Sequence, residues 1–73
     1  MSKYVVIYEP SDTGWGAYVP DLPGLGVVGS TQEETRQLIR QGIDLHIQDL
    51  RDGGSSVPTP STLFEEIEVN IHG

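Results

Sequence analysis

The stretch STQEETRQLIRQGIDLHIQDLRDGG, residues 30–54, decides the fold because it predicts one long helix with both ends marked. Ser30 and Glu33 form a capping box, in which the serine hydroxyl accepts the Glu33 N–H and the glutamate reaches back to the Ser30 N–H. The pair Gly53-Gly54 provides a left-handed stop. We therefore predict a helix over residues 31–52.

This predicted helix has one apolar side. At helical spacing, a single stripe collects Thr35, Ile39, Ile43, His46, Ile47 and Leu50. We interpret His46 as a packed core histidine. Leu38 and Leu45 form a second apolar patch beside Gly42. A glycine inside a helix costs ~1 kcal/mol relative to alanine, which indicates that another element packs closely there.

Three strands are predicted before the helix. Residues 3–9 are β-branched and aromatic, and residues 10–14 have turn chemistry. Residues 15–20 then form the second arm of a hairpin. A Pro-Gly turn at residues 21–24 leads into a short third strand at residues 25–29.

After the helix, the chain is predicted to become extended. The prolines of residues 55–61 exclude helix and favour an extended connector. Residues 64–71 alternate as a fourth strand does, with Ile67, Val69 and Ile71 on one face and Glu66, Glu68 and Asn70 on the other.

The predicted fold is α+β, with the element order βββαβ in a single domain over residues 1–73. A right-handed crossover places the fourth strand beside the first, in a mixed four-stranded sheet of order 3-2-1-4 with the helix on one face. One helix covers only one face of such a sheet, so we expect a homo-oligomer, a dimer or tetramer. Its predicted contacts are Tyr4, Val6, Tyr8, Leu38 and Leu45.

The charge of the chain narrows the class of partner. Four Lys+Arg against eleven Asp+Glu give a net charge of −7, which disfavours direct binding to nucleic acid. Such a surface suits solvation or docking to a basic protein. No apolar run approaches the ~18 residues of a membrane span, and the amino terminus does not resemble a signal peptide, so a cytoplasmic protein without membrane contact is expected.

No catalytic, cofactor or metal site is predicted. Residues 24–29 match G-x-G-x-x-G, but Val27 and Val28 inside the motif read as strand and Ser30 already caps the helix. The chain contains no cysteine, and only His72 could join His46 in a metal site. Its acids and serines fall in turns, caps and surface positions, so we expect a non-enzymatic protein.

Five segments resemble the HicB-like antitoxin family, in matching order and spacing. They are YVVI (residues 4–7), GAYVPDLPG (16–24), GSTQEE (29–34), IDLHI (43–47) and VPTP (57–60). The string AYVPDLPG, followed closely by a helix cap, is the most specific of them.

The resemblance implies a partial ribonuclease-H-like fold and a role in type II toxin–antitoxin pairs. In such pairs the antitoxin binds and masks a small basic mRNA-cleaving toxin of the HicA kind. Typical members carry a further C-terminal DNA-binding domain, so operator binding is not expected of these 73 residues. The alternative is a solitary self-associating structural or regulatory domain without a toxin.

Two surfaces are predicted to bind the partner. One is the turn at residues 20–24 together with Tyr18 of the preceding strand. The other is the acidic face of the last strand. Their residues are Tyr18, Pro20, Asp21, Leu22, Pro23, Gly24, Glu66 and Glu68.

Overall fold

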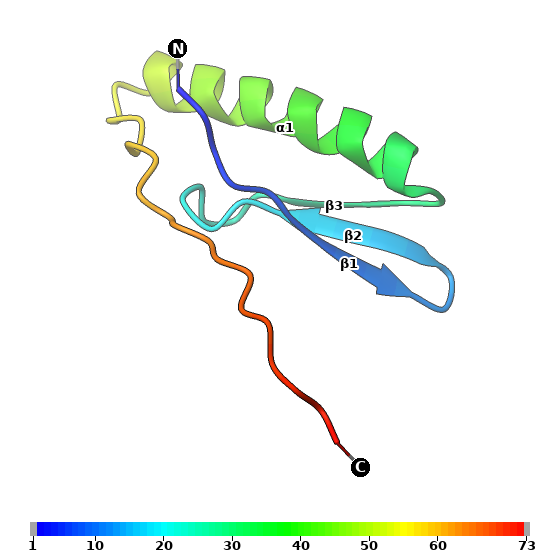
Figure 1. Ribbon diagram of the computed structural model, residues 1–73. Helices are drawn as coiled ribbons and strands as arrows, with labels where there is room; N and C mark the ends of the chain where they lie inside the picture. The colour runs from blue at the N-terminus through cyan, green and yellow to red at the C-terminus, as the bar shows by residue number, and fades with distance from the viewer. Residues whose placement is uncertain (1, 73) are drawn as a thin grey trace.

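A three-stranded sheet and one helix make up the regular structure of residues 2–72 (Figure 1). The computed structural model describes residues 2–72, so the end residues Met1 and Gly73 of the predicted domain lie outside it. The elements are β1 (Ile7–Ser11), β2 (Gly14–Tyr18), β3 (Gly26–Gly29) and α1 (Gln32–Asp52). The sheet order is β1-β2-β3, and both pairs are antiparallel.

The two predicted hairpins are confirmed, although their boundaries differ. β1 begins later than residue 3 and continues through Pro10 to Ser11, which pairs with Gly14 across a shorter loop than expected. The second connection, from β2 to β3, contains two successive turns. In the first turn, the Leu22 N–H donates to the Val19 carbonyl at 3.0 Å. In the second turn, the Leu25 N–H donates to the Leu22 carbonyl at 3.3 Å.

The helix forms where predicted, but its cap lies one residue later. Thr31, not Ser30, is the N-cap, and its hydroxyl accepts the Glu34 N–H at 3.0 Å. Glu34, not Glu33, reaches back and accepts the Ser30 N–H at 2.8 Å. At the other end, Gly54 takes a φ of +75°, and the Ser55 N–H donates to the Leu50 carbonyl at 2.8 Å. This is the left-handed stop predicted from the glycine pair.

The core lies between the sheet and α1, which packs mainly on β3 and β2. Cross-strand register aligns Tyr8, Ala17 and Val27 in one row, and all three belong to the core or pack against it. The buried apolar residues are Ala17, Val19, Leu22 and Ile39. A Cβ added at Gly42 would lie 3.0 Å from Leu25 Cδ1, so the close packing predicted at this glycine is confirmed.

The predicted four-stranded sheet of order 3-2-1-4 is wrong. Within residues 2–72 there is no fourth strand, and residues 64–71 are extended without ladder partners. β1 is therefore an edge strand rather than a central one. The alternation of residues 64–71 indicates a chain able to form a strand, but alternation does not specify which edge a strand pairs with, and these residues do not pair with the free edge of β1. Figure 1 shows this part of the chain running away from the sheet.

No helix within residues 2–72 combines the length and apolar character needed to cross a membrane.

Leu22→Ala tests the dependence of the core on the second turn. Leu22 is 0% exposed, so we expect its truncation to lower the free energy of unfolding by about 2–5 kcal/mol through lost burial and a cavity. Leu45→Ala is the matched control, since Leu45 is 62% exposed and its truncation removes little buried surface. Urea denaturation of both variants measures the difference, and equal losses would contradict the assignment of Leu22 to the core.

Thr31→Ala tests the corrected cap. Removing the hydroxyl that accepts the Glu34 N–H is expected to cost about 1 kcal/mol of unfolding free energy, whereas Ser30→Ala should cost much less. Thermal unfolding followed by far-ultraviolet circular dichroism compares the two. A larger loss of unfolding free energy for Ser30→Ala than for Thr31→Ala would indicate that Ser30 is the N-cap, as first predicted.

Candidate functional site

The turn at residues 20–24 divides its residues between core and surface. Leu22 is fully buried beneath the helix layer, whereas Pro20, Pro23 and Gly24 are exposed. Gly24 takes a φ of +88°, as the turn prediction requires. The turn therefore offers a partner two proline rings and a glycine, while its leucine is withdrawn into the fold.

Asp21 of this turn holds the chain that follows the helix. One carboxylate oxygen, Oδ2, accepts the backbone N–H groups of Ser61 and Thr62, each at 3.0 Å. The other, Oδ1, accepts the Ser61 hydroxyl at 3.0 Å and the Thr62 hydroxyl at 2.8 Å. Four hydrogen bonds thus join residues about forty positions apart in the sequence.

These hydrogen bonds change the acidity of Asp21. Donors aimed at a carboxylate favour its charged form. The backbone N–H of Thr62 has the largest effect, followed by that of Ser61, and together with the two hydroxyls they lower the pKa of Asp21 from 3.8 to about 2. Asp21 is accordingly ionised at neutral pH, with its oxygens already occupied by its own chain.

A second contact fixes the connector a few residues earlier. The Tyr4 hydroxyl donates to the Pro58 carbonyl at 2.6 Å, joining the N-terminal stretch to the proline-rich segment. The chain between the helix and Thr62 is thereby held beside the start of the sheet (Figure 1).

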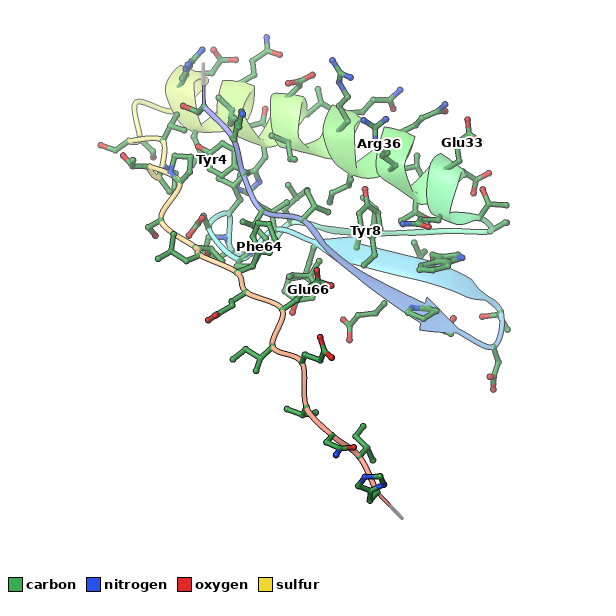
Figure 2. All side chains as sticks on the ribbon, in the orientation of Figure 1. Tyr4, Tyr8, Glu33, Arg36, Phe64 and Glu66 are labelled. Carbon is green, nitrogen blue, oxygen red and sulfur yellow. The ribbon has the colours of Figure 1, made fainter. Side chains whose placement is uncertain are left out.

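Beyond Thr62, the chain projects into solvent. We call residues 63–72 the C-terminal segment. Its large apolar side chains are 66–92% exposed: Leu63, Phe64, Ile67, Val69 and Ile71. Glu65, Glu66 and Glu68 are exposed as well, and the segment carries no lysine or arginine. Figure 2 shows Phe64 beside the stretch that leads into β1, and Glu66 further along the segment.

The remaining predicted contact residues fall into two groups. Tyr4, Val6 and Tyr8 are half-buried and pack against the core. Tyr18, Leu38 and Leu45 are exposed, to 43%, 37% and 62% respectively. The structure therefore brings the predicted turn residues together but packs Tyr4, Val6 and Tyr8 against the core of their own chain.

The G-x-G-x-x-G match does not have the geometry of a dinucleotide site. Val27 and Val28 of the G-x-G-x-x-G match lie in β3, so the glycines do not form the turn into the helix that a dinucleotide needs. Within residues 2–72, no group of three or more His, Cys, Asp or Glu side chains could hold a metal ion. His46 is half-buried in α1.

Sequence reasoning missed the partners of Asp21 and Tyr4. Pro58 and Ser61 fall in the predicted extended connector of residues 55–61, Thr62 was assigned to no element, and no partner was predicted for any of the three. An acidic turn residue and a Ser-Thr pair are each common in loops, so their pairing across the chain has no local signal. The one available hint is that a Ser-Thr pair presents two hydroxyl and two N–H donors to a single carboxylate.

One helix over a three-stranded antiparallel sheet, followed by an exposed acidic and apolar segment, defines a small α+β domain with surface left for association. A family model described as "HicB_like antitoxin of bacterial toxin-antitoxin system" matches residues 4–71. The chain belongs to this HicB-like antitoxin family, as its sequence motifs indicated.

Two curated relatives extend the comparison. The chain is 32% identical over 76 residues to "Antitoxin HicB 2" of Photorhabdus laumondii subsp. laumondii, covering 94% of this chain and 52% of that protein. It is 31% identical over 48 residues to a "UPF0150 protein" of Thermotoga maritima, covering 66% of this chain and 64% of that protein. The chain thus spans about half to two thirds of the length of these relatives.

Asp21→Asn tests the link between the turn and the connector. The depressed pKa of Asp21 means that its contribution to stability is fully present above about pH 4 and is lost as the pH falls toward 2. We expect the stability of Asp21→Asn to fall less than that of the wild type as the pH is lowered from about 4 to about 2, because an asparagine side chain does not titrate in this range. Thermal unfolding between pH 2 and pH 5 measures it, with Asp44→Asn on the exposed side of α1 as control.

Amide hydrogen exchange gives a local readout of the same contact. The Ser61 and Thr62 N–H groups should exchange faster in Asp21→Asn than in the wild type, because each loses a charged acceptor. Unchanged exchange at both positions would contradict the role assigned to Asp21.

Proposed function

We propose that this protein is a non-enzymatic antitoxin that binds and masks a small basic mRNA-cleaving toxin of the HicA kind. The observation that carries the proposal is the exposed acidic C-terminal segment in a chain of net charge −7 that belongs to an antitoxin family. The toxin must bind a polyanion, so its RNA-binding surface is expected to be positive. An acidic protein surface is the complement of such a surface. In this role the protein would act in the cytoplasm, beside the mRNA.

The proposed toxin-binding surface is narrower than the sequence alone suggested. Asp21 already accepts four hydrogen bonds from its own chain, and Leu22 is in the core, so neither is free for a partner. The exposed residues that remain are Tyr18, Pro20, Pro23, Gly24, Glu66 and Glu68. We assign the electrostatic contribution to Glu66 and Glu68 and the apolar contribution to Tyr18 and the prolines.

A second candidate is a self-associating domain without a toxin. The apolar side chains of the C-terminal segment favour association with some macromolecule whether or not a toxin exists. A basic protein encoded beside this chain that co-purifies with it, and whose growth arrest it relieves, supports the antitoxin role. If only this protein is recovered in the co-purification experiment, the result supports the second candidate.

Glu66→Lys/Glu68→Lys tests the toxin-binding surface. Reversing both charges should weaken binding of the basic toxin at least about tenfold, equivalent to ~1.4 kcal/mol, with the larger effect at low ionic strength. Asp49→Lys/Asp52→Lys makes the same change in net charge on exposed positions of α1 and is the matched control. Isothermal titration calorimetry at two salt concentrations measures both variants. Equal losses of affinity in the two variants would mean that only net charge matters. No loss in Glu66→Lys/Glu68→Lys would mean that the toxin binds another surface.

A further inference from the structure

The C-terminal segment has the features of a strand but no sheet. Ile67, Val69 and Ile71 alternate with Glu66, Glu68 and Asn70, and each of these three apolar side chains is at least 66% exposed. None of its described residues takes part in a ladder. A single extended strand is not stable in water, because its backbone groups lack partners and its apolar row remains hydrated.

β1 has a free edge, to which no further strand is paired. It pairs with β2 alone, so the N–H and C=O groups on its outer side lack ladder partners. Beside this edge, a shallow depression runs beneath α1, lined by Val6, Tyr8, Arg36, Ile39, Arg40 and Ile43. Figure 2 shows Tyr8 directed from the sheet toward the helix on this side. Edge and depression together would accept a strand that has one apolar row.

The segment does not fill this site in its own chain. The hydrogen bonds of Asp21 to Ser61 and Thr62, with that of Tyr4 to Pro58, determine where the segment starts. Phe64 still borders a depression formed by residues 3–7, but the chain then leaves the sheet (Figure 1). The segment is thus held at its beginning and directed outward.

We propose that the protein forms a homodimer by reciprocal exchange, in which the C-terminal segment of each copy pairs along the β1 edge of the other. Each chain contains both an unpaired strand and an unpaired edge, so a twofold axis satisfies both with identical contacts. This proposal goes beyond toxin binding and does not depend on it. Glu66 and Glu68 lie on the row opposite Ile67 and would remain available to a toxin.

The distribution of charge favours a second copy of this chain as the partner that binds the β1 edge. The segment contains three glutamates and no lysine or arginine, whereas Lys3, Arg36 and Arg40, three of the four Lys+Arg of the chain, lie beside the β1 edge and the two depressions near it. Glu65 lies in the same row as Ile67, which places it toward the arginines when the apolar row enters the depression. A basic toxin would meet Arg36 and Arg40 at this site and be repelled.

Charge also disfavours the simplest competing dimer. If two C-terminal segments paired with each other antiparallel about Ile67, Glu66 of one would face Glu68 of the other twice. Like charges directly opposite each other destabilise a strand pair. Exchange onto β1 avoids this repulsion.

Sedimentation equilibrium at micromolar concentration is the first test. The chain has a mass of 8.0 kDa, and we expect the wild type to sediment at twice that mass. Ile67→Asp/Val69→Asp should shift the protein to the monomer, whereas Asn70→Asp on the opposite row, the matched control, should remain dimeric. Far-ultraviolet circular dichroism confirms that α1 is retained in each variant. A monomeric wild type, or a dimer that survives Ile67→Asp/Val69→Asp, would overturn the proposal.

Cross-linking distinguishes exchange from the competing dimer, because the chain contains no cysteine of its own. Glu9→Cys on β1 is mixed in turn with Glu66→Cys, Glu68→Cys and Asn70→Cys proteins under mild oxidation. We expect a mixed disulfide between Glu9→Cys and at least one of the three, which can form only between two chains. Disulfides of the segment variants with themselves alone would indicate self-paired segments and contradict exchange.

Discussion

The turn at residues 20–24 holds this small domain together through two adjacent residues. Leu22 enters a core that, within residues 2–72, contains four buried apolar residues, and Val19, from the same connection, is another of them. Asp21 accepts four hydrogen bonds from Ser61 and Thr62 and so attaches the chain that follows the helix. A domain of this size buries only about 60% of its unfolded surface, so a thin core depends strongly on each such contact. Both the packing of α1 and the course of the C-terminal segment depend on this turn.

The parts of the fold that could be predicted from the sequence are those with local causes. The helix, its glycine stop and the two hairpins each follow from signals within a few residues of one another. The cap was displaced by one residue because Ser30-Thr31 and Glu33-Glu34 offer two equivalent boxes. Burial of Thr35, whose hydroxyl donates to the Thr31 carbonyl at 2.7 Å, selects the Thr31 box by setting the phase of the helix against the sheet.

The errors concern contacts between distant parts of the chain. The alternation of residues 64–71 predicted a strand and its two faces, but alternation does not specify the edge to which a strand pairs. The start of the segment is instead held by Asp21 and Tyr4, which bond to residues 58, 61 and 62, and nothing in the sequence near these residues indicates those partners. The binding role predicted for the exposed residues of the turn and segment stays a prediction. The structural roles of Asp21 and Leu22 were not predicted, because they depend on contacts between distant parts of the chain.

These structural roles bear on where a family member of this kind recognises its partner. The string AYVPDLPG, through which the chain most resembles the HicB-like family, includes buried Ala17, Val19 and Leu22, and its aspartate is occupied by the connector. Four of its eight residues are therefore already used in folding, whereas Tyr18, Pro20, Pro23 and Gly24 are exposed. The charges available for recognition lie elsewhere and are separated, with the acids on the C-terminal segment and the cations near β1 and α1. Such a separation allows one chain to associate with its own copy through the apolar row of the segment and with a basic protein through the acidic row.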